Sequence, residues 1–464
     1  NLISDQEPEL QDAFARCIRE DFSIFNGPYV HCTPCYKQAE TLQQLIRGTE
    51  GIRLAARMSA IPKEQFDPSR PLYSHQVEAL GILGDDRNLV VATGTGSGKT
   101  ECFLLPILDH VLKKPGPGLR AIIIYPMNAL ADDQLSRLRK LLVGIPEVTF
   151  GRYTGDTPEE VDGIERPSEV VANERYTRQE IRSNPPHILL TNFAMLEYLM
   201  LRPRDSDIFE ANRLQFIVLD EAHTYSGAQG IEIALLMRRL REYLVGGERN
   251  LQFVLTSATL GDEEDATSKV VKFASDISGA EFSEEEVLRG ETVDEFSDKL
   301  TSFPDRDVLL RIGGDEEGFT AWGSALSTTI KLADKLKEAG IECPDPVGQM
   351  PSRLLFELLA GSEPLNRVHR QCRRRPSMLP DLCELLDLPP DSVGMRAVQW
   401  LVTMGAYARR SSDSAPLLPT RFHFFARGLS GASVCLAEDC PAKETHPNTG
   451  WSAFYLEDRN VCKE

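Results

Sequence analysis

Several features that narrow the class of a protein are scarce in this sequence of 464 residues. No apolar run reaches the roughly 18 residues that a helix needs to cross a bilayer, which argues against an integral membrane protein. Ten cysteines are too few for a disulfide-stapled scaffold, and no secretory signal opens the chain, so we expect a protein of the reducing cytoplasm. The chain begins with Asn1 rather than Met, and we therefore expect a portion of a longer polypeptide.

Positive charge is scarce too, because 51 Lys and Arg residues stand against 70 Asp and Glu residues, for a formal net charge of −19. This balance argues against nonspecific coating of nucleic acid. The acidic residues are concentrated, however, since residues 261–320 hold 18 of them and only 6 basic residues. The rest of the chain is close to balanced, so a local basic groove is compatible with the composition.

Changes in composition and in the spacing of apolar residues predict four segments. A chain of this length is expected to form about two to four domains. We expect a helical and then irregular extension over residues 1–70 and an α/β domain over 71–260. An acidic and then mostly helical region follows over 261–425. The last segment, 426–464, contains cysteines and glycines and has no helical periodicity.

Six short apolar runs dominate the second segment. Continuous apolar runs without alternation are typical of strands that are covered on both faces, as in a parallel sheet. Stretches with helical spacing, such as 130–142 and 231–244, lie between them. The alternation predicts a doubly wound parallel sheet with strands at 89–92, 121–125, 148–150, 188–190, 216–219 and 253–255.

The strongest local signal follows the first of these runs, where residues 92–100 read Ala-Thr-Gly-Thr-Gly-Ser-Gly-Lys-Thr. Glycines let backbone N–H groups turn toward phosphate oxygens, and the helix that follows adds its N-terminal dipole. We predict that Lys99 reaches the β- and γ-phosphates of ATP and that the Thr100 hydroxyl holds Mg²⁺. The predicted phosphate contacts are Thr93, Gly94, Thr95, Gly96, Ser97, Gly98, Lys99 and Thr100.

A second signal, Asp220-Glu221-Ala222-His223, follows the run 216–219. Residues just beyond the carboxyl ends of parallel strands lie beside the ligand in doubly wound sheets. We expect Asp220 to bind Mg²⁺ and Glu221 to act as general base toward the attacking water. His223 is expected to link the γ-phosphate region to the next loop. Together with Lys99, these are the predicted catalytic residues.

In order, these blocks resemble the first RecA-like lobe of superfamily 2 DEAD/DEAH-box helicases. The resemblance is carried further by Gln76 in Tyr73-Ser74-His75-Gln76, by residues 126–134, 154–156 and 191–196, and by Ser257-Ala258-Thr259. Residues 187–198 and 220–230 are similar to the MrfA/YprA-like branch, near which lie large helicases of anti-phage systems of the Druantia and DISARM kinds. The resemblance implies a RecA-like sheet and ATP-dependent movement on single-stranded DNA, usually 3′→5′.

The resemblance also assigns roles outside the phosphate loop. Gln76 would read adenine, with Arg70 or Tyr73 beside the base. Ser257 and Thr259 would couple the nucleotide site to the DNA. The DNA backbone would run over a set of small polar and basic residues. The alternative for each of them is that its side chain only caps a turn at the end of a strand. These residues are Asn128, Arg152, Thr154, Thr191 and Asn192.

No motifs of a second RecA-like lobe follow Thr259. In this family the second lobe supplies arginines that close the ATP site, so the resemblance implies that this chain binds ATP weakly and hydrolyses it poorly by itself. The second lobe would come from the rest of the polypeptide or from a partner, and residues 261–425 would be an insertion between the lobes. Defence-complex proteins are further expected partners, and a membrane is not.

The last segment holds Cys435, Cys440 and Cys462. A zinc ribbon needs four soft ligands, usually as two close pairs. We interpret this segment as a partial zinc-ribbon-like element in which the chain stops before the fourth cysteine. His446 as the fourth ligand, or three unrelated thiols, are the alternatives.

Two further patterns are less specific. Cys32 and Cys35 have CxxC spacing without a second pair nearby, which favours structural thiols over a metal site. Five arginines between 367 and 375 are interpreted either as a phosphate or DNA contact or as a solvated helix end.

The sequence is therefore compatible with three functions. The first is the N-terminal motor part of a DNA helicase, which couples Mg²⁺-ATP hydrolysis to movement on DNA in anti-phage defence or repair. The second is a translocase in a restriction-like complex that never separates strands. The third is a nucleotide-gated assembly subunit.

Overall fold

The computed structural model describes residues 25–426 except 50, 95, 161–165, 211–212, 246–250, 258–265 and 412–413, together with the strands at 433–435 and 453–455. Contacts divide the chain into two compact units. We call Tyr36–Val293 the sheet unit, and the residues up to Cys35 together with those from Asp294 onward the helical unit. Within the described ranges, no helix is both long and apolar enough to pass through a membrane.

The sheet unit is built on eight strands in the order β11-β4-β10-β9-β5-β8-β6-β7, and every pairing between them is parallel. This confirms the doubly wound sheet expected from the continuous apolar runs. The strands are β4 (Leu89–Ala92), β5 (Ala121–Tyr125), β6 (Phe150–Tyr153), β7 (Glu174–Arg175), β8 (Ile188–Asn192), β9 (Phe216–Leu219), β10 (Gln252–Ser257) and β11 (Val287–Leu288).

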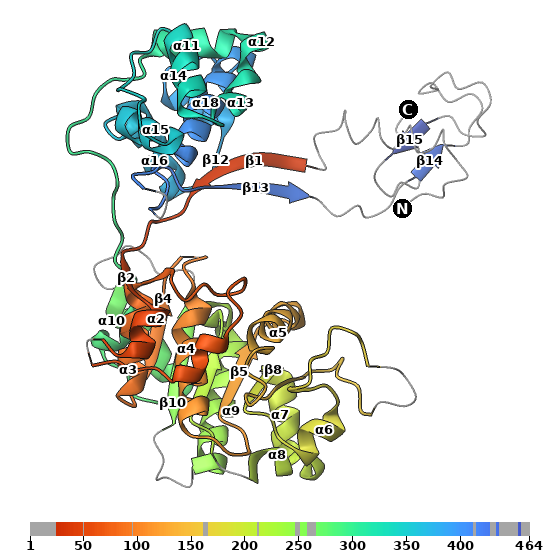
Figure 1. Cartoon of the computed structure of the whole chain (residues 1–464). Coiled ribbons are helices and arrows are strands. Elements are labelled where there is room, and N and C mark those ends of the chain that lie inside the picture. Colours follow the sequence, from red (N-terminus) through yellow and green to blue (C-terminus); the bar gives the residue numbers. More distant parts are fainter. Residues whose placement is uncertain are drawn as a thin grey trace. The chain divides into compact units, whose positions relative to one another are not determined.

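Helices cover both faces of this sheet (Figure 1). One core joins α3 (Ser74–Gly84), α4 (Lys99–Lys113) and α5 (Asn128–Leu142) to strand residues such as Val91 and Ile123. The other core joins α7 (Phe193–Leu201), α9 (Gly227–Val245) and α10 (Ala266–Ser278) to their neighbours in the strands, such as Val90 and Ile122. Because successive strand residues point to opposite faces, both halves of each apolar run are buried.

Short elements complete the sheet unit. The antiparallel pair β2 (Gln38–Thr41) and β3 (Pro71–Tyr73) leads into α3, with α2 (Leu42–Arg47) and a 3-10 turn (Ala56–Ala60) between them. Between β7 and β8 lies α6 (Arg178–Ser183), and between α7 and β9 lie a 3-10 turn (Pro203–Asp205) and α8 (Asp207–Glu210). Further 3-10 turns follow β9 (Ala222–Thr224) and precede β11 (Glu284–Glu286).

The limits of the sheet unit differ from the expected range 71–260. It begins at Tyr36 because β2 pairs with β3, and it extends to Val293 because β11 pairs with β4. All six predicted strands are present among the eight of this sheet, and the ends of β6, β8 and β10 differ from the predicted ones. The unpredicted β7 and β11 are two residues long each, too short to produce a pattern in the sequence.

The helical unit packs its helices against a three-stranded antiparallel sheet, ordered β12-β1-β13. The strand β1 (Phe25–Cys32) lies in the segment expected to be an irregular extension, and it pairs with β12 (Ser377–Met378) and β13 (Thr420–Ala426). The helices are α11 (Arg306–Gly314), α12 (Glu316–Phe319), α13 (Ala321–Ala325), α14 (Thr329–Glu338), α15 (Pro351–Leu359), α16 (Glu363–Arg374), α17 (Leu379–Leu385) and α18 (Ser392–Tyr407).

A mostly helical region was expected here, and these helices bury a core of their own that includes Trp322 and Trp400. Farther along the chain, β14 (Ser433–Cys435) pairs with β15 (Ala453–Tyr455).

Candidate active site

The phosphate loop lies where the sequence predicted it, between β4 and α4. Gly96 and Gly98 have φ angles of 82° and 74°, in the left-handed region that favours glycine. A Cβ atom at Gly98 would lie 2.2 Å from Nε2 of Gln76, so a larger residue would displace that amide. Within the loop, the hydroxyls of Thr93 and Ser97 are 2.5 Å apart. Thr95 lies outside the described residues.

Side chains from an earlier part of the chain hold this loop from outside. The amide of Gln76 accepts from the Tyr73 N–H (2.9 Å) and donates to the Gly98 carbonyl oxygen (3.1 Å). His75 lies 3.0 Å from the Ser97 carbonyl oxygen, and burial lowers its pKa. The Tyr36 hydroxyl accepts from the Gly94 N–H at 3.0 Å. Only Gln76 was predicted, because the other two contacts leave no local sequence pattern.

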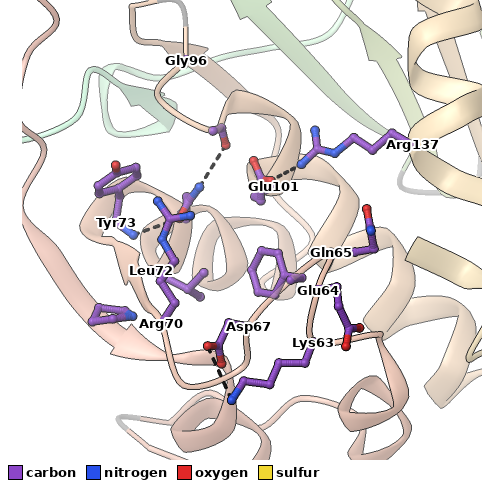
Figure 2. A pocket seen from close by; sticks show the side chains of 14 residues that line it. Lys63, Glu64, Gln65, Asp67, Arg70, Leu72, Tyr73, Gly96, Glu101 and Arg137 are labelled. Atoms are coloured by element: carbon purple, nitrogen blue, oxygen red, sulfur yellow. Dashed lines mark hydrogen bonds and ion pairs between the residues drawn. The ribbon is translucent and has the colours of Figure 1, made fainter. Parts of the chain in front are cut away.

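A pocket of about 450 Å³ opens beside the loop (Figure 2). Arg70 and Tyr73, the two residues expected to flank a base, both line it. Its far wall carries the ion pair between Arg137 and Glu101. Gly96, Gly98 and Gln76 belong to the same lining, so the pocket joins the phosphate loop to the residues expected at adenine. The sequence did not single out Phe66, which also lines the pocket.

The two predicted acidic residues follow β9, on the other side of β10 from the phosphate loop. Glu221 has a left-handed backbone conformation, with φ of 48°. Its N–H donates to the Thr256 hydroxyl at 2.9 Å, and that hydroxyl donates to Oδ1 of Asp220. One threonine at the end of β10 thus fixes both acidic residues, and it was not predicted. Its neighbour Ser257 ends β10, whereas Thr259 lies outside the described residues.

The predicted catalytic lysine and glutamate meet across the site. Lys99 Nζ lies 3.1 Å and 3.4 Å from the two carboxylate oxygens of Glu221, and the lysine side chain is 8% exposed. His223 Nδ1 lies 3.4 Å from the same carboxylate. Lys99 and Glu221, which are 122 positions apart in the sequence, therefore meet in one cluster with His223, and Thr256 joins Asp220 to it.

Asp220 has the residue chemistry for a divalent cation. Burial raises the pKa of its carboxyl group, while the hydrogen bond from Thr256 opposes the rise. Mg²⁺ prefers oxygen ligands and binds proteins through one or two carboxylates, with phosphates and water completing its shell. The Asp220 carboxylate and the Thr100 hydroxyl, on the first turn of α4, are an oxygen donor set of this kind.

The residues expected along DNA lie at or just beyond the carboxyl ends of β5, β6 and β8, which are neighbours in the sheet, and Asn128 begins α5. The Asn192 amide donates to Oδ1 of Asn128 at 2.8 Å, and the Asn128 amide donates to the Asp156 carboxylate at 3.2 Å. Asn192 also caps α7 by accepting from the Met195 N–H. The two asparagines therefore form one polar row at this edge.

The other three residues of that set lie differently. Arg152 forms an ion pair with Asp132. Thr191 and Thr154 are buried, and the Thr191 hydroxyl donates to the Tyr153 carbonyl oxygen at 2.7 Å. The Thr191 hydroxyl thus ties β8 to β6, whereas the buried Thr154 hydroxyl has no hydrogen-bond partner among the described residues. Their role toward DNA stays a prediction.

The remaining predictions concern the expected zinc-ribbon cysteines, the Cys32–Cys35 pair and the five arginines between 367 and 375. The Cys440 and Cys462 positions lie outside the described residues, and no group of three metal-binding side chains occurs in the part that the structure describes. Burial raises the pKa of the Cys35 thiol to about 11, as expected for a structural thiol. Arg367 hydrogen-bonds to the Leu385 carbonyl oxygen, Arg373 and Arg374 lie in the last turn of α16, and Arg375 is its C-cap.

The sequence profile of the DEAD/DEAH box helicase family matches residues 73–267. Residues 73–267 form a DEAD/DEAH box helicase domain. The match begins at Tyr73, beside the predicted adenine residues, and includes the phosphate loop, the acidic cluster and the asparagine row.

The relatives of this chain are longer proteins, of which it matches only a part. Druantia protein DruE of Escherichia coli (strain UMEA 4076-1) is 29% identical over 532 residues, which include 91% of this chain and 28% of that protein. Uncharacterized ATP-dependent helicase YprA of Bacillus subtilis (strain 168) is 31% identical over 224 residues, with 47% of this chain and 27% of that protein. This chain thus spans between a quarter and a third of their length.

Among solved structures, the DUF1998 helicase MrfA bound to DNA and AMPPNP is similar to this chain, with 20% identity and a TM-score of 0.44. The similarity covers 75% of this chain and 44% of MrfA.

Proposed function

We propose that this chain is the ATP-binding motor part of a DNA helicase, which couples Mg²⁺-ATP hydrolysis to movement along a single strand. The observation that carries the proposal is the contact between Lys99 and Glu221, since it joins the phosphate loop to the acidic cluster inside a DEAD/DEAH box helicase domain. The 450 Å³ pocket beside the loop provides room for the nucleoside.

ATP binding begins with the loop and its supports. Backbone N–H groups of the loop and the N-terminus of α4 would face the phosphates, and Lys99 would exchange its contact with Glu221 for one with the β- and γ-phosphates. Gln76, already bonded to the Gly98 carbonyl oxygen, would sense the base and the loop together. Arg70 and Tyr73 would flank the base.

Hydrolysis then depends on Glu221. Once Lys99 turns to the phosphates, the carboxylate of Glu221 is free to accept a proton from the attacking water. Thr256 holds this residue in its left-handed conformation. His223 Nδ1 lies 3.4 Å from the carboxylate, and this side chain would link the γ-phosphate region to the next loop. Mg²⁺, held by Thr100 and Asp220, would neutralise charge on the phosphates.

The single nucleic-acid strand would cross the carboxyl ends of β5, β8 and β6 in the same sheet. Amides and backbone groups suit a motor, because they can hold phosphates without reading bases. The Asn128–Asn192 row is such a surface, with Arg152, Thr154 and Thr191 beside it. That the strand is DNA follows from the resemblance to the MrfA/YprA-like branch, while Ser257 and Thr259 would couple the two sites.

The complete protein would add what this chain lacks. A second RecA-like lobe would bring arginines to the ATP site, so hydrolysis by this chain alone would be weak. The identity shared with DruE along nearly the whole chain favours a role in anti-phage defence, in the cytoplasm and with partner proteins. A Zn²⁺ ion held by Cys435, Cys440 and Cys462 remains part of this proposal.

The test is ATP hydrolysis by the complete protein with and without single-stranded DNA. We expect DNA to stimulate the wild-type rate and Lys99→Ala to abolish the stimulated rate. Lys331→Ala, which removes an exposed lysine of the helical unit, is the matched control and should retain it. A wild-type rate in Lys99→Ala would refute the site. Strand separation assays then distinguish a helicase from a translocase.

A further inference from the structure

A second pocket of the sheet unit lies away from the nucleotide. It has a volume of about 390 Å³ and is lined by Arg166, Arg175, Gln179, Glu180, Ser183 and Asn184. These residues come from β7, from α6 and from the segments that flank them. All six lining side chains are polar, and two are arginines, which is the composition of an anion site rather than of an apolar ligand site.

The single acidic residue of the lining is already neutralised. One carboxylate oxygen of Glu180 pairs with Arg166, and the other accepts from the Tyr176 N–H at 2.9 Å. Glu180 is therefore unavailable to a second guanidinium, and Arg175 remains the surplus positive charge of the pocket.

Arg175 lacks the partner that its neighbour has. Glu174, the other residue of β7, receives both of its hydrogen bonds from Arg139, each at 2.7 Å. In contrast, no hydrogen bond or ion pair joins the Arg175 guanidinium to any other residue that the structure describes, and its Nε is buried. Burial and the nearby Arg166 both lower the pKa of Arg175. A partly buried guanidinium beside a second cation is stabilised by an anion.

The pocket lies on the strand next to β6, whose carboxyl end belongs to the edge expected to hold the nucleic acid. In the sheet, Arg175 pairs with Gly151 of β6, about 10 Å before Thr154 along that strand. In α6, Arg178 donates to the carbonyl oxygens of Thr154 (3.0 Å) and Gly155 (3.1 Å). The helix that forms the pocket thus also holds the turn next to Asp156, which ends the asparagine row.

We propose that this pocket binds a backbone phosphate of the nucleic-acid strand, through the guanidinium of Arg175. The inference rests on the proposed function, because it places the strand at the neighbouring edge of the sheet. Arg175 gives a bidentate phosphate contact without reading a base, and Gln179 and Asn184 can donate to the same phosphate. The strand would pass from the asparagine row, over the turn held by Arg178, to this pocket.

The test is a titration of the complete protein with a labelled, mixed-sequence, single-stranded oligonucleotide over a range of salt concentrations. We expect Arg175→Gln to weaken binding roughly tenfold at low salt. Loss of one phosphate contact should also reduce the slope of log Kd against log salt by about 0.7. Arg175→Lys should keep the slope, because the charge is retained.

Two further variants separate the pocket from other causes of weaker binding. One controls for the loss of a positive charge elsewhere, and the other changes the pocket without altering Arg175. Arg57→Gln removes an exposed arginine of the same unit that pairs with Glu147, and it should leave the slope unchanged. Ser183→Asp places a negative charge on the exposed rim of the pocket and should weaken binding as Arg175→Gln does. Unchanged affinity and slope in both Arg175→Gln and Ser183→Asp would overturn the proposal.

Calorimetry with inorganic phosphate distinguishes the source of the anion. Binding of phosphate that Arg175→Gln abolishes, with normal oligonucleotide binding, would overturn the strand proposal and leave a site for free phosphate. If the wild type bound no oligonucleotide, the proposed function would fail, and the phosphate titration alone would then decide whether the pocket binds an anion. If Asn192→Asp weakens oligonucleotide binding and Arg175→Gln does not, only the present inference fails.

Discussion

Two regions at the carboxyl ends of the parallel strands differ in their chemistry. We call the phosphate loop with the Asp220–His223 segment the nucleotide end, and the Asn128–Asn192 row, where the nucleic-acid strand is expected, the strand edge. At the nucleotide end, charged side chains are partly buried and paired with one another, as Lys99 is with Glu221. At the strand edge, neutral amides form a row in which Asn192 donates to Asn128. Under the proposed function, the first end would redistribute charge when ATP enters, whereas the second would hold a nucleic-acid chain that slides.

Glu221→Gln gives the largest expected effect and tests the nucleotide end alone. The carboxylate is lost as a general base while its size is kept, so kcat for ATP should fall by about 10²- to 10⁴-fold. The KM for ATP and the affinity for the oligonucleotide should change little. Steady-state hydrolysis and strand titrations of the same preparation check this. A kcat within a few-fold of wild type would contradict the assigned role, and Glu342→Gln, an exposed glutamate of the helical unit, is the control.

Thr256→Val gives the next largest effect and tests the support behind the acidic cluster. Valine keeps the shape but removes the hydroxyl that joins Asp220 to the Glu221 N–H. A lost hydrogen bond to a charged group costs about 1.5–3 kcal/mol, so kcat should fall by roughly tenfold or more. Thr256→Ser should restore most of the rate.

The pH dependence separates this support from a merely structural role. Burial raises the pKa of Asp220, and the Thr256 hydrogen bond opposes that rise. If Asp220 holds Mg²⁺ as the ionised carboxylate, as we propose, activity is present above its pKa and is lost as pH falls through it. Removal of the hydroxyl should move the acidic limb of kcat to higher pH. An unshifted limb in Thr256→Val would contradict the proposed support.

Asn192→Asp gives the smallest effect and tests the strand edge alone. Aspartate is as good a helix cap as asparagine, so α7 should keep its stability. The change removes the amide that reaches Asn128 and adds a negative charge that repels phosphates. We expect several-fold weaker oligonucleotide binding with unaltered unfolding in denaturant. Asn192→Ala should in addition lower the free energy of unfolding by about 0.5–2 kcal/mol.

The strands of the nucleotide end were predictable because each is a local block in the sequence. Continuous apolar runs located β4, β5 and β9, and the residues predicted to carry the chemistry follow directly after β4 and β9. The supports of that end were missed for a physical reason: Tyr36 and Thr256 act through contacts with residues 58 and 36 positions away, respectively. The sequence around Tyr36 and Thr256 contains no pattern that predicts these contacts.

The helical unit shows the same limit on a larger scale. Its helices were expected from apolar spacing, but β1 was not, because the pairing partner of Val30 is Phe422. The strand edge lies between these cases. Asn128 and Asn192 were assigned by resemblance, whereas Arg175 and Arg178 lie in a stretch without a recognisable motif, and only the fold brings them to that edge.

We propose that ATP at the phosphate loop and the nucleic-acid strand at the Asn128–Asn192 row influence each other's binding. The most direct test of this proposal is the affinity of the complete protein for a single-stranded oligonucleotide, measured with and without a non-hydrolysable ATP analogue. We predict that the analogue changes the affinity of the wild type several-fold and leaves that of Lys99→Ala unchanged. If the wild type binds both ligands and its affinity for the oligonucleotide is the same with and without the analogue, the ends are not coupled and the motor account is contradicted.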